Sequence, residues 1–395
     1  MGDMMPKGLT KNDLVKIFFV KPFLGLVYKV NCLKKPDEKL VVFADDRTNG
    51  LSQNFQQVKK AFENQGDYKF ISLVADNRSK PLTTRVKEMA KAVKIMAHAK
   101  YIIVEDYYFP LYCFKKRPET KCAQVWHGSG ALKKAGYSVI SSEGGTTPQQ
   151  AKWLPFHTNY DLVSISDEKI TWVYAESFNM IGQEDKILPL GVARSDLFFC
   201  EDYVNMCKEK FLDIMPQSKG KKMLLYAPTY RGTVNKPDTS FHLPVKELYE
   251  NFKDEYVLAI KLHPFIGENV TIDEKYSDFA HVFPTTMTVN ELLPVADVLI
   301  TDYSSSVFEY SLFGRPMVFF AYDKSDYDGF KGFYYKYEDL VPGPICQTGE
   351  ELVEALKGID FESAKQTAEE FRLKYMSACN GKCSENIVKE LTKQE

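Results

Sequence analysis

Short hydrophobic runs alternate with amphipathic segments along the first half of the chain. The runs are four or five residues long, which is typical of strands buried on both faces of a sheet. These predicted strands are Leu40–Ala44, Phe70–Val74, Tyr101–Val104, Ala123–Trp126 and Leu162–Ile165. Between them, Asn54–Asn64 and Thr83–Ala97 repeat hydrophobic residues at helical spacing, with charged residues opposite. This alternation predicts a parallel sheet covered by helices on both faces.

The same alternation restarts after a charged helical segment, Glu201–Phe211, and a polar loop, Pro216–Lys221. The strands predicted in the second half are Met223–Tyr226, Tyr256–Ile260, Val298–Thr301 and Met317–Phe320. The predicted helices are Val245–Phe252, Val289–Val295, Ser306–Phe313, Glu350–Leu356, Phe361–Met376 and Ser384–Thr392. We therefore expect an α/β protein with two Rossmann-like halves, 39–215 and 216–380, a cleft between them, and a closing helix at 381–395.

Length and composition narrow the class of protein. A chain of 395 residues suits two domains, and a net charge of −2 with 26% charged residues argues against a strongly basic nucleic-acid binder. The eight cysteines contain no C-x-x-C pair, which makes a zinc site improbable. Without a disulfide-like framework or a signal-peptide pattern, the sequence favours a reducing, cytoplasmic location.

The N-terminal residues 1–38 form a basic amphipathic segment. Its hydrophobic stretch, Leu14–Lys29, is interrupted by Lys16, Lys21 and Pro22, so it lacks the roughly 20 apolar residues that cross a bilayer. Mixed aromatic, aliphatic and lysine residues suit a helix lying at a membrane surface. The alternative is a helix packed on its own domain, and the sequence does not decide between the two.

The first half places a histidine at a strand end, where ligands of such sheets bind. In the segment QVWHGSGALKKAG, His127 directly follows a predicted strand, and Gly128 lets another molecule approach the backbone. An imidazole can accept a proton at neutral pH. The alternative is a histidine bonded to neighbouring backbone, but the lysines that follow, Lys133 and Lys134, favour a functional role.

The second half supplies polar groups at several strand ends. Arg231 follows the first predicted strand, and a guanidinium matches phosphate oxygens in two parallel hydrogen bonds. Pro264 would end the second strand and fix His263 at its rim. Asp323 is a weaker candidate of the same kind. Together these groups predict a phosphate pocket.

Three consecutive serines, Ser304, Ser305 and Ser306, follow Thr301 and Asp302. Ser306 and Glu309 match the S-x-x-E capping box, in which a serine begins a helix and a glutamate three residues later returns a hydrogen bond. One cap requires only one serine. We therefore expect Ser306 and Glu309 to close the helix start, while Ser304 and Ser305 face a phosphate.

Five ordered segments resemble the CDP-glycerol glycerophosphotransferase family, the teichoic-acid primases and polymerases of bacterial cell walls. These segments, which lie within roughly residues 40–380, are QVWHGSGALKKAG, LYAPTYRG, KLHP, VLITDYSSSVFEYSLFGRPMVFF and GFYYKYEDLVPGP. The resemblance implies a GT-B fold of two facing Rossmann-like domains with a central cleft. It also implies transfer of polyol phosphate from a CDP-linked donor to a hydroxyl of an undecaprenyl-linked acceptor, with release of CMP, at the cytoplasmic face of the membrane.

The resemblance also implies roles for individual residues. His127 would be the base that deprotonates the acceptor hydroxyl, with Gly128, Lys133 and Lys134 on the acceptor side. His263 would bind the donor pyrophosphate. The further donor-side residues would be Arg231, Pro264, Thr301, Asp302, Ser304, Ser305, Ser306 and Glu309.

Three alternatives stay open at this stage. CDP-ribitol transferases share these motifs, so the polyol is undecided between glycerol and ribitol. A CMP-sialic-acid glycosyltransferase would also carry a His-Pro and a paired-serine motif, although the WHG and PGP segments argue against it. A nucleotide-binding protein without transfer activity would be expected to lack His127. The sequence identifies no metal site and leaves a requirement for Mg²⁺, the acceptor, single addition versus polymerisation, and the oligomeric state open.

Overall fold

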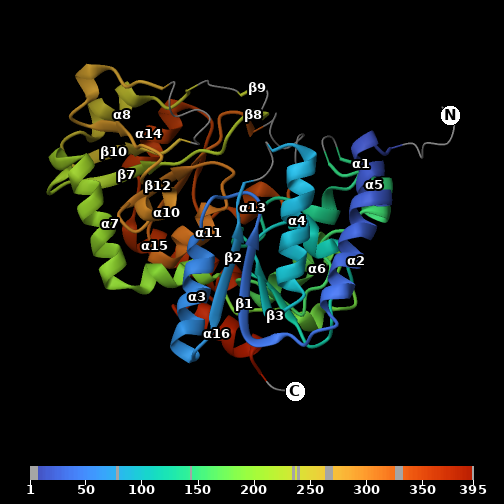
Figure 1. The fold of residues 1–395 in the computed structure, drawn as a ribbon. Helices are drawn as coiled ribbons and strands as arrows, with labels where there is room; N and C mark the ends of the chain where they lie inside the picture. The colour runs from blue at the N-terminus through green and yellow to red at the C-terminus, as the bar shows by residue number, and fades with distance from the viewer. Residues whose placement is uncertain are drawn as a thin grey trace. The chain divides into compact units, whose positions relative to one another are not determined.

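The computed structural model describes residues 8–76, 80–142, 145–233, 236–237, 241–262, 270–324 and 332–393. The chain divides into two compact units. Unit 1 comprises Met1–Ser129, Lys134–Asp196 and Ala378–Glu395, and unit 2 comprises Gly130–Lys133 and Leu197–Ser377. Each unit is built around one parallel sheet (Figure 1).

Unit 1 contains a six-stranded parallel sheet in the order β2-β1-β3-β4-β5-β6. Its strands are β1 (Asp37–Asp45), β2 (Lys69–Val74), β3 (Ala99–Val104), β4 (Lys121–Gln124), β5 (Leu162–Ser164) and β6 (Ile187–Leu188). Phe43 and Ile103 are fully buried on one face of this sheet, and Val42 and Ile102, which alternate with them, are equally buried. The sheet is therefore covered on both faces, as the hydrophobic runs predicted.

Helices from distant parts of the sequence cover this sheet. They are α3 (Gln53–Gln65), α4 (Leu82–Met96), α5 (Pro148–Trp153), α6 (Thr171–Ser177) and α16 (Cys383–Leu391), with 3₁₀ turns η2 (Phe109–Cys113), η3 (Gly136–Val139), η4 (Glu168–Ile170) and η5 (Glu184–Lys186). In Figure 1, α16 lies beside α3, and both helices bury hydrophobic residues in the same core. On the other side α4 packs against α2, introduced below, and η2. Strand β6 and the turns were not predicted, because elements of two to five residues carry little periodicity.

Unit 2 repeats the architecture with the strand order β11-β10-β7-β12-β13-β14, again all parallel. Its strands are β7 (Lys222–Tyr226), β10 (Tyr256–Ile260), β11 (Ala280–Val282), β12 (Val298–Thr301), β13 (Met317–Phe320) and β14 (Ile345–Cys346). A separate antiparallel pair joins β8 (Gly232–Thr233) to β9 (Lys236–Pro237). Every strand predicted in this half is present.

The helices of unit 2 also follow the predicted positions closely. They are α7 (Glu201–Ile214), α8 (Val245–Phe252), α10 (Val289–Leu292), α11 (Ser306–Tyr310), α13 (Tyr337–Leu340), α14 (Gly349–Lys357) and α15 (Phe361–Tyr375), with 3₁₀ turns η7 (Pro216–Ser218), η8 (Glu274–Tyr276) and η9 (Ser311–Phe313). Leu248 and Leu352, on α8 and α14, are fully buried in the same core cluster as the strands β7, β10 and β12.

The division into units differs from the predicted domain ranges at two places. The chain enters unit 2 at Leu197 instead of near residue 215, because α7 packs against η7 and α10, with Lys210 paired to Glu291 at 2.7 Å. The last helix returns to unit 1, where the carboxylate of Asp196 accepts the backbone N–H groups of Cys383 and Ser384, both at 2.8 Å. A carboxylate stabilises the N-terminus of a helix because it accepts hydrogen bonds from the free N–H groups there. This contact anchors α16 to unit 1.

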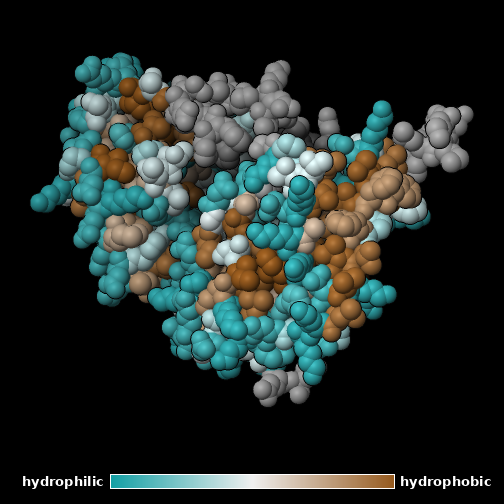
Figure 2. Space-filling model, viewed as in Figure 1, coloured by the Kyte–Doolittle hydropathy of each residue, from teal (hydrophilic) through white to brown (hydrophobic). Residues whose placement is uncertain are grey.

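The N-terminal segment forms α1 (Lys11–Val15), one π-helical turn η1 (Lys16–Val20) and α2 (Lys21–Asn31). One side packs on unit 1: Leu24 is fully buried, and the ring of Tyr28 stacks on Phe114 at 3.7 Å. The opposite side is exposed, and its hydrophobic residues are visible along α2 in Figure 2. We call this side the exposed apolar face; it consists of Phe18, Phe19, Phe23, Leu26 and Val30.

The segment therefore packs on its own unit, as the second interpretation expected, and it also presents hydrophobic side chains to solvent. Contact with a membrane stays a prediction. Among the helices in the described ranges, none has the length and hydrophobicity required to cross a bilayer.

Candidate functional site

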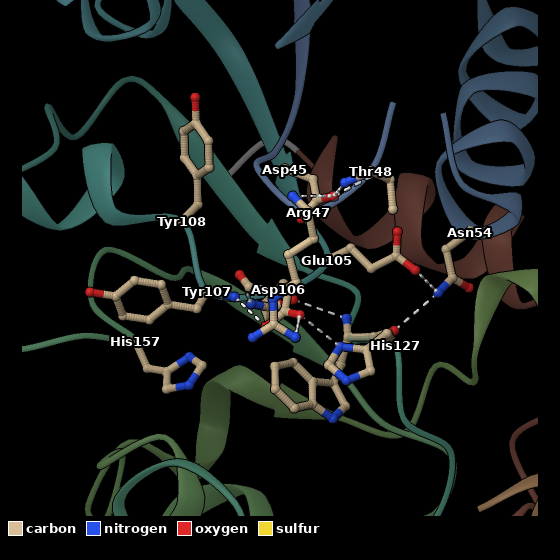
Figure 3. A network of polar contacts seen from close by, with 12 residues as sticks. Asp45, Arg47, Thr48, Asn54, Glu105, Asp106, Tyr107, Tyr108, His127 and His157 are labelled. Carbon is tan, nitrogen blue, oxygen red and sulfur yellow. Dashed lines mark hydrogen bonds and ion pairs between the residues drawn. The ribbon is translucent and has the colours of Figure 1, made fainter. Parts of the chain in front are cut away.

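Two clusters of polar side chains lie at strand ends, one in each unit. In unit 1 the cluster follows β1, β3 and β4 (Figure 3). His127 is an accessible member of this cluster, with a side chain 45% exposed. Its Nδ1 lies 3.4 Å from Oδ2 of Asp106, whose side chain is almost completely buried. The pairing occupies one ring nitrogen and leaves Nε2 available to a ligand.

Asp106 is held from several directions. Its Oδ2 also contacts a guanidinium nitrogen of Arg47 at 2.6 Å, and its Oδ1 accepts the backbone N–H of Tyr107 at 2.6 Å. Arg47 is placed by a tight turn after β1, in which Oδ2 of Asp45 accepts the N–H groups of Arg47 and Thr48 at 3.2 and 3.1 Å. The carboxylate is thus fixed before any ligand arrives, and it can hold the imidazole in one orientation.

The backbone just before His127 is strained. Trp126 has φ +41°, a left-handed conformation that an aromatic residue seldom adopts. The side-chain oxygen of Gln124 accepts a hydrogen bond from the N–H of Trp126 at 3.0 Å. The side-chain amide of Asn54 donates to the carbonyl of Trp126, also at 3.0 Å. The carbonyl of His127 accepts from Arg194 at 2.7 Å. Backbone strain held by specific hydrogen bonds is common at functional sites, where it directs a side chain toward its task.

Two other ionisable groups of this cluster are buried. Burial raises the pKa of Glu105, although hydrogen bonds from Ser52 and Asn54 oppose the rise. Burial lowers the pKa of His157 to about 3, because its ring stacks on Phe178 at a distance of 4.1 Å between ring centres. His157, which appeared unremarkable in the sequence, is therefore a neutral core residue at physiological pH.

The close packing of the loop after His127 explains why it contains glycines. A Cβ at Gly128 would come within 2.9 Å of the Trp126 ring nitrogen, so the bare backbone lets the tryptophan lie flat beneath it. Gly130 has φ +64°, and a Cβ there would approach the ring of Phe308 to 2.3 Å. Of the predicted acceptor-side lysines, Lys134 is exposed in unit 1. Lys133 belongs to unit 2, where it forms a β-bridge with Phe333.

In unit 2 the charged side chains of the corresponding cluster bind one another. The guanidinium of Arg231 contacts Asp323 at 2.5 and 3.0 Å and Asp302 at 2.8 Å, and it donates to the carbonyl of Thr229 at 2.7 Å. Burial opposes the charge of Arg231, but the hydrogen bonds and charges of the two carboxylates raise its pKa. The ring of Tyr303 adds a cation–π contact at 5.0 Å. The predicted phosphate fork is thus directed at two aspartates of its own unit.

Thr301 and Asp302 also serve the local structure. The hydroxyl of Thr301 donates to the carbonyl of Ala227 at 2.6 Å. Oδ1 of Asp302 accepts the N–H groups of Thr229 and Tyr303 at 2.7 and 2.6 Å. These bonds tie the end of β12 to the end of β7, so both residues position the neighbouring loops.

The predicted capping box is wrong. The helix α11 begins at Ser306, its N-cap is Ser305, and no side-chain hydrogen bond closes the cap. Instead, Oγ of Ser304 accepts from the N–H and the hydroxyl of Ser306, at 3.3 and 2.9 Å. Ser305 is exposed, while Glu309 is buried, at 3% exposure. Ser304 therefore forms a local serine turn with Ser306 just before the helix, in place of the predicted contact between Ser306 and the N–H of Glu309.

Other predicted donor residues cannot be placed, since His263 and Pro264 lie outside the described residues. Within the described ranges, no three His, Cys, Asp or Glu side chains are grouped as a metal site would require. Sequence reasoning overlooked Asp106, Arg47 and Asn54, which complete the His127 cluster. Their signal was available, since Glu105 and Asp106 directly follow a predicted strand, as His127 does.

Comparison with known proteins gives one family and one fold. Residues 26–393 match the sequence model of the family described as CDP-glycerol:poly(glycerophosphate) glycerophosphotransferase. The chain is 34% identical to the teichoic acid ribitol-phosphate primase of Bacillus spizizenii, over 93% of this chain and 95% of that protein. It is 33% identical to the teichoic acid glycerol-phosphate primase of Bacillus subtilis, over 68% of each.

A longer relative is the teichoic acid poly(ribitol-phosphate) polymerase of Bacillus spizizenii, 35% identical over 89% of this chain, which spans only 56% of that protein. Among solved structures, the wall teichoic acid polymerase TagF aligns over 97% of this chain and 98% of its own, with a TM-score of 0.76 and 24% identity. This similarity confirms the predicted α/β fold of GT-B type.

Proposed function

The chain belongs to the CDP-glycerol:poly(glycerophosphate) glycerophosphotransferase family, and from this premise we propose that it transfers a polyol phosphate from a CDP-linked donor to a hydroxyl of a lipid-linked acceptor. The observation that carries the proposal is the His127 cluster, an accessible imidazole paired with a buried carboxylate at a strand end. A protein that only bound nucleotide would not need this pairing. With the family established, the CMP-sialic-acid glycosyltransferase alternative falls away.

In the proposed reaction, Nε2 of His127 takes the proton of the acceptor hydroxyl. The acceptor oxygen attacks the β-phosphorus, a new P–O bond forms, and the bond to the bridging oxygen breaks, so that CMP leaves with that oxygen. Asp106 holds the ring and stabilises the imidazolium that forms. Phosphoryl transfer depends mainly on positioning and charge stabilisation, which a prearranged cluster of this kind supplies.

On the donor side, the occupied guanidinium of Arg231 suggests a revised role. We propose that Arg231 positions the strand ends by holding Asp302 and Asp323, and does not bind the pyrophosphate itself. The partly exposed hydroxyls of Ser304 and Ser305 remain our candidates for the donor phosphates, together with His263 and Pro264. Thr301, Ser306 and Glu309 would support them from buried positions.

We further propose that the exposed apolar face rests on the cytoplasmic surface of the membrane that holds the acceptor. Its phenylalanines are 47–71% exposed, which is unfavourable in water. Lys21 and Lys29 flank them in the same segment and would meet anionic headgroups. Charge-reversal variants of these lysines that bind liposomes as well as the unchanged protein would contradict this proposal.

The polyol is a separate question, and ribitol is a second candidate because the two highest identities cited above belong to ribitol-phosphate enzymes. The test is CMP release by the purified protein from CDP-glycerol and CDP-ribitol, each with a lipid-linked acceptor, with and without EDTA. Release from one donor that is lost in His127→Ala would support the proposal and identify the polyol. Loss of release with EDTA would reveal a metal requirement. Release that persists in His127→Ala would contradict the role of that histidine.

A further inference from the structure

Unit 1 contains a cavity of about 260 Å³ beside the His127 cluster. Five segments line it: the π-helical turn η1, the residue that follows β1, the end of β2, helix α4, and the residues that follow β3. Its volume is close to the lower end of the roughly 300–1,000 Å³ typical of small-molecule sites. We call it the α4 cavity.

The cavity exists because the edge of the sheet is incompletely covered. Strand β2 is the edge strand, and its Leu73 and Val74 stay partly exposed, unlike the fully buried residues of β1 and β3. Helix α4 packs on α2 and η2, which leaves space between the helix and the strand end. A closed core would have filled this space with large side chains.

The lining is mostly hydrophobic, with charged groups of both signs. Hydrophobic side chains, among them Leu73, Val74 and Met89, form most of the wall. Three cations, Lys16, Arg85 and Lys91, also line it, and they outnumber its two carboxylates, Asp46 and Glu88. The guanidinium of Arg85 is only partly exposed, and within the described ranges it has no ion pair or side-chain hydrogen bond. Hydrocarbon contacts beside an unpaired arginine suit a ligand that joins an apolar chain to a phosphate.

The position of the cavity connects two features described above. Its lining includes Asp46 and Tyr107, and the N–H of Tyr107 is bonded to Asp106 of the His127 cluster. It also includes Lys16 and Val20 of η1, whereas Phe18 and Phe19 of the same turn belong to the exposed apolar face. The wider π-helical turn thus directs Lys16 and Val20 to the cavity and the phenylalanines to solvent. Such turns frequently mark functional sites.

We infer that the α4 cavity binds the phosphate and the adjoining hydrocarbon of the lipid-linked acceptor. The inference rests on the proposed function for the identity of that lipid. A site between the exposed apolar face and His127 would hold the lipid end of the acceptor while its hydroxyl reaches the imidazole. Binding energy gained at this remote part of the substrate would then be used to position the reacting group.

The test is direct binding of farnesyl phosphate to the full-length protein, measured by calorimetry below its critical micelle concentration. Arg85→Glu should weaken this binding by about tenfold or more, since it replaces a charge-assisted contact with a repulsive one. Lys87→Glu is the matched control, because Lys87 is an exposed cation on the same helix outside the lining, and it should bind like the unchanged protein. Met89→Trp, which fills the cavity, should weaken binding as well if its thermal unfolding is unchanged.

Binding measurements with other ligands identify which part of farnesyl phosphate is recognised. They also show whether the cavity prefers the acceptor lipid or an ordinary membrane lipid. Farnesol and inorganic phosphate should each bind at least tenfold more weakly than farnesyl phosphate. Short-chain phosphatidylglycerol that binds as tightly as farnesyl phosphate would show a site for membrane lipid and would overturn the assignment to the acceptor. Equal binding by Arg85→Glu and Lys87→Glu would overturn the site itself.

Transfer kinetics separate this inference from the proposed function. In Arg85→Glu the KM for the lipid-linked acceptor should rise, while the KM for the CDP-linked donor stays unchanged. If the unchanged protein binds farnesyl phosphate but releases no CMP from any donor, the proposed function fails and the binding site stands. If transfer is normal and farnesyl phosphate does not bind, the inference alone is overturned.

Discussion

The two strand-end clusters use similar residues to opposite effect. In unit 1 a buried carboxylate, Asp106, supports an imidazole whose side chain is 45% exposed. In unit 2 the buried carboxylate Asp302 and its neighbour Asp323 bind the guanidinium of Arg231, whose side chain is only 12% exposed. The first arrangement offers its ionisable group to a ligand, whereas the second uses its charges internally.

This difference suggests how work is divided between the units. A base must be reachable and free to change its protonation state, which an imidazole at the surface of a cluster allows. A donor site must instead hold loops in fixed places so that hydroxyls and backbone groups meet phosphate oxygens. Arg231 with its two aspartates gives that rigidity. We therefore expect substitutions in unit 1 to affect turnover and those in unit 2 to affect stability and donor binding.

The largest expected effect is on turnover in His127→Ala. Removing the general base should lower kcat by roughly 10²–10⁴-fold. Donor affinity, measured by calorimetry with CDP-glycerol and CDP-ribitol, should stay within about twofold of the unchanged protein. His263→Ala should weaken both donor binding and turnover. An equal loss of donor affinity in the two variants would break the proposed division of roles.

The next effect is on the stability of unit 2. Arg231→Met leaves Asp302 and Asp323 without their partner, and breaking a buried ion pair from one side costs about 3–5 kcal/mol in the free energy of unfolding. Lys324→Met is the control, because Lys324 pairs with Glu338 nearer the surface and should cost about 1 kcal/mol or less. Urea denaturation measures both. A small loss in Arg231→Met, with weakened donor binding, would restore the original phosphate-binding role.

A smaller effect should separate positioning from chemistry in unit 1. Asp106→Asn keeps the shape but loses the charge that holds His127, and charge-assisted hydrogen bonds contribute about 1.5–3 kcal/mol. We expect kcat to fall by roughly 10–150-fold with unchanged KM values. Asp106→Glu should recover part of the loss, since it restores the charge. Unchanged kcat in Asp106→Asn would mean that His127 works without its carboxylate.

The buried histidine of the same unit predicts how stability depends on pH. The pKa of His157 is about 3 in the folded protein, against about 6.5 in an unfolded chain. Between these values the unfolded state binds the extra proton, so stability falls as pH falls through this window. From pH 6.5 to pH 5 the loss is about 2 kcal/mol. Urea unfolding at both pH values should show this loss, and His157→Phe should remove most of it. A loss of the same size in the variant would assign it to other groups.

The smallest effect concerns the serine loop of unit 2. Ser305 is exposed, and its side chain makes no capping hydrogen bond at the start of α11, so Ser305→Ala should leave stability unchanged. If its hydroxyl meets a donor phosphate, donor affinity should fall by about 2–10-fold, the value of one ordinary hydrogen bond. Thr367→Ala, a substitution of an exposed hydroxyl on α15, serves as the control. Identical donor affinity in both would exclude Ser305 from the donor site.

The comparison also shows what the sequence could predict. Runs such as Val298–Thr301 identified strands because burial on both faces demands continuous hydrophobic residues. His127 was identified because it directly follows a predicted strand, and sheets of this kind bind ligands at the carboxyl ends of their strands. The ion pair between Arg231 and Asp323 joins residues that are distant in the sequence, so the sequence alone does not reveal it. The capping prediction failed because the helix begins one residue earlier than the pattern required: Ser305 is the N-cap, and the hydroxyl of Ser306 donates to Ser304.

The return of α16 to unit 1 has a consequence for the order in which the protein is made. The hydroxyl of Ser384 donates to Asp196 at 2.6 Å, and Ile387 is fully buried against the residues of α3. Between these partners the ribosome must synthesise Leu197–Ser377, which takes roughly 10–40 s at bacterial speeds of about 5–20 residues per second. Unit 2 is therefore synthesised before the last helix, and part of the hydrophobic core of unit 1 stays uncovered until that helix is made. A released chain truncated after Ser377 should accordingly show a protease-resistant unit 2 and a protease-sensitive unit 1.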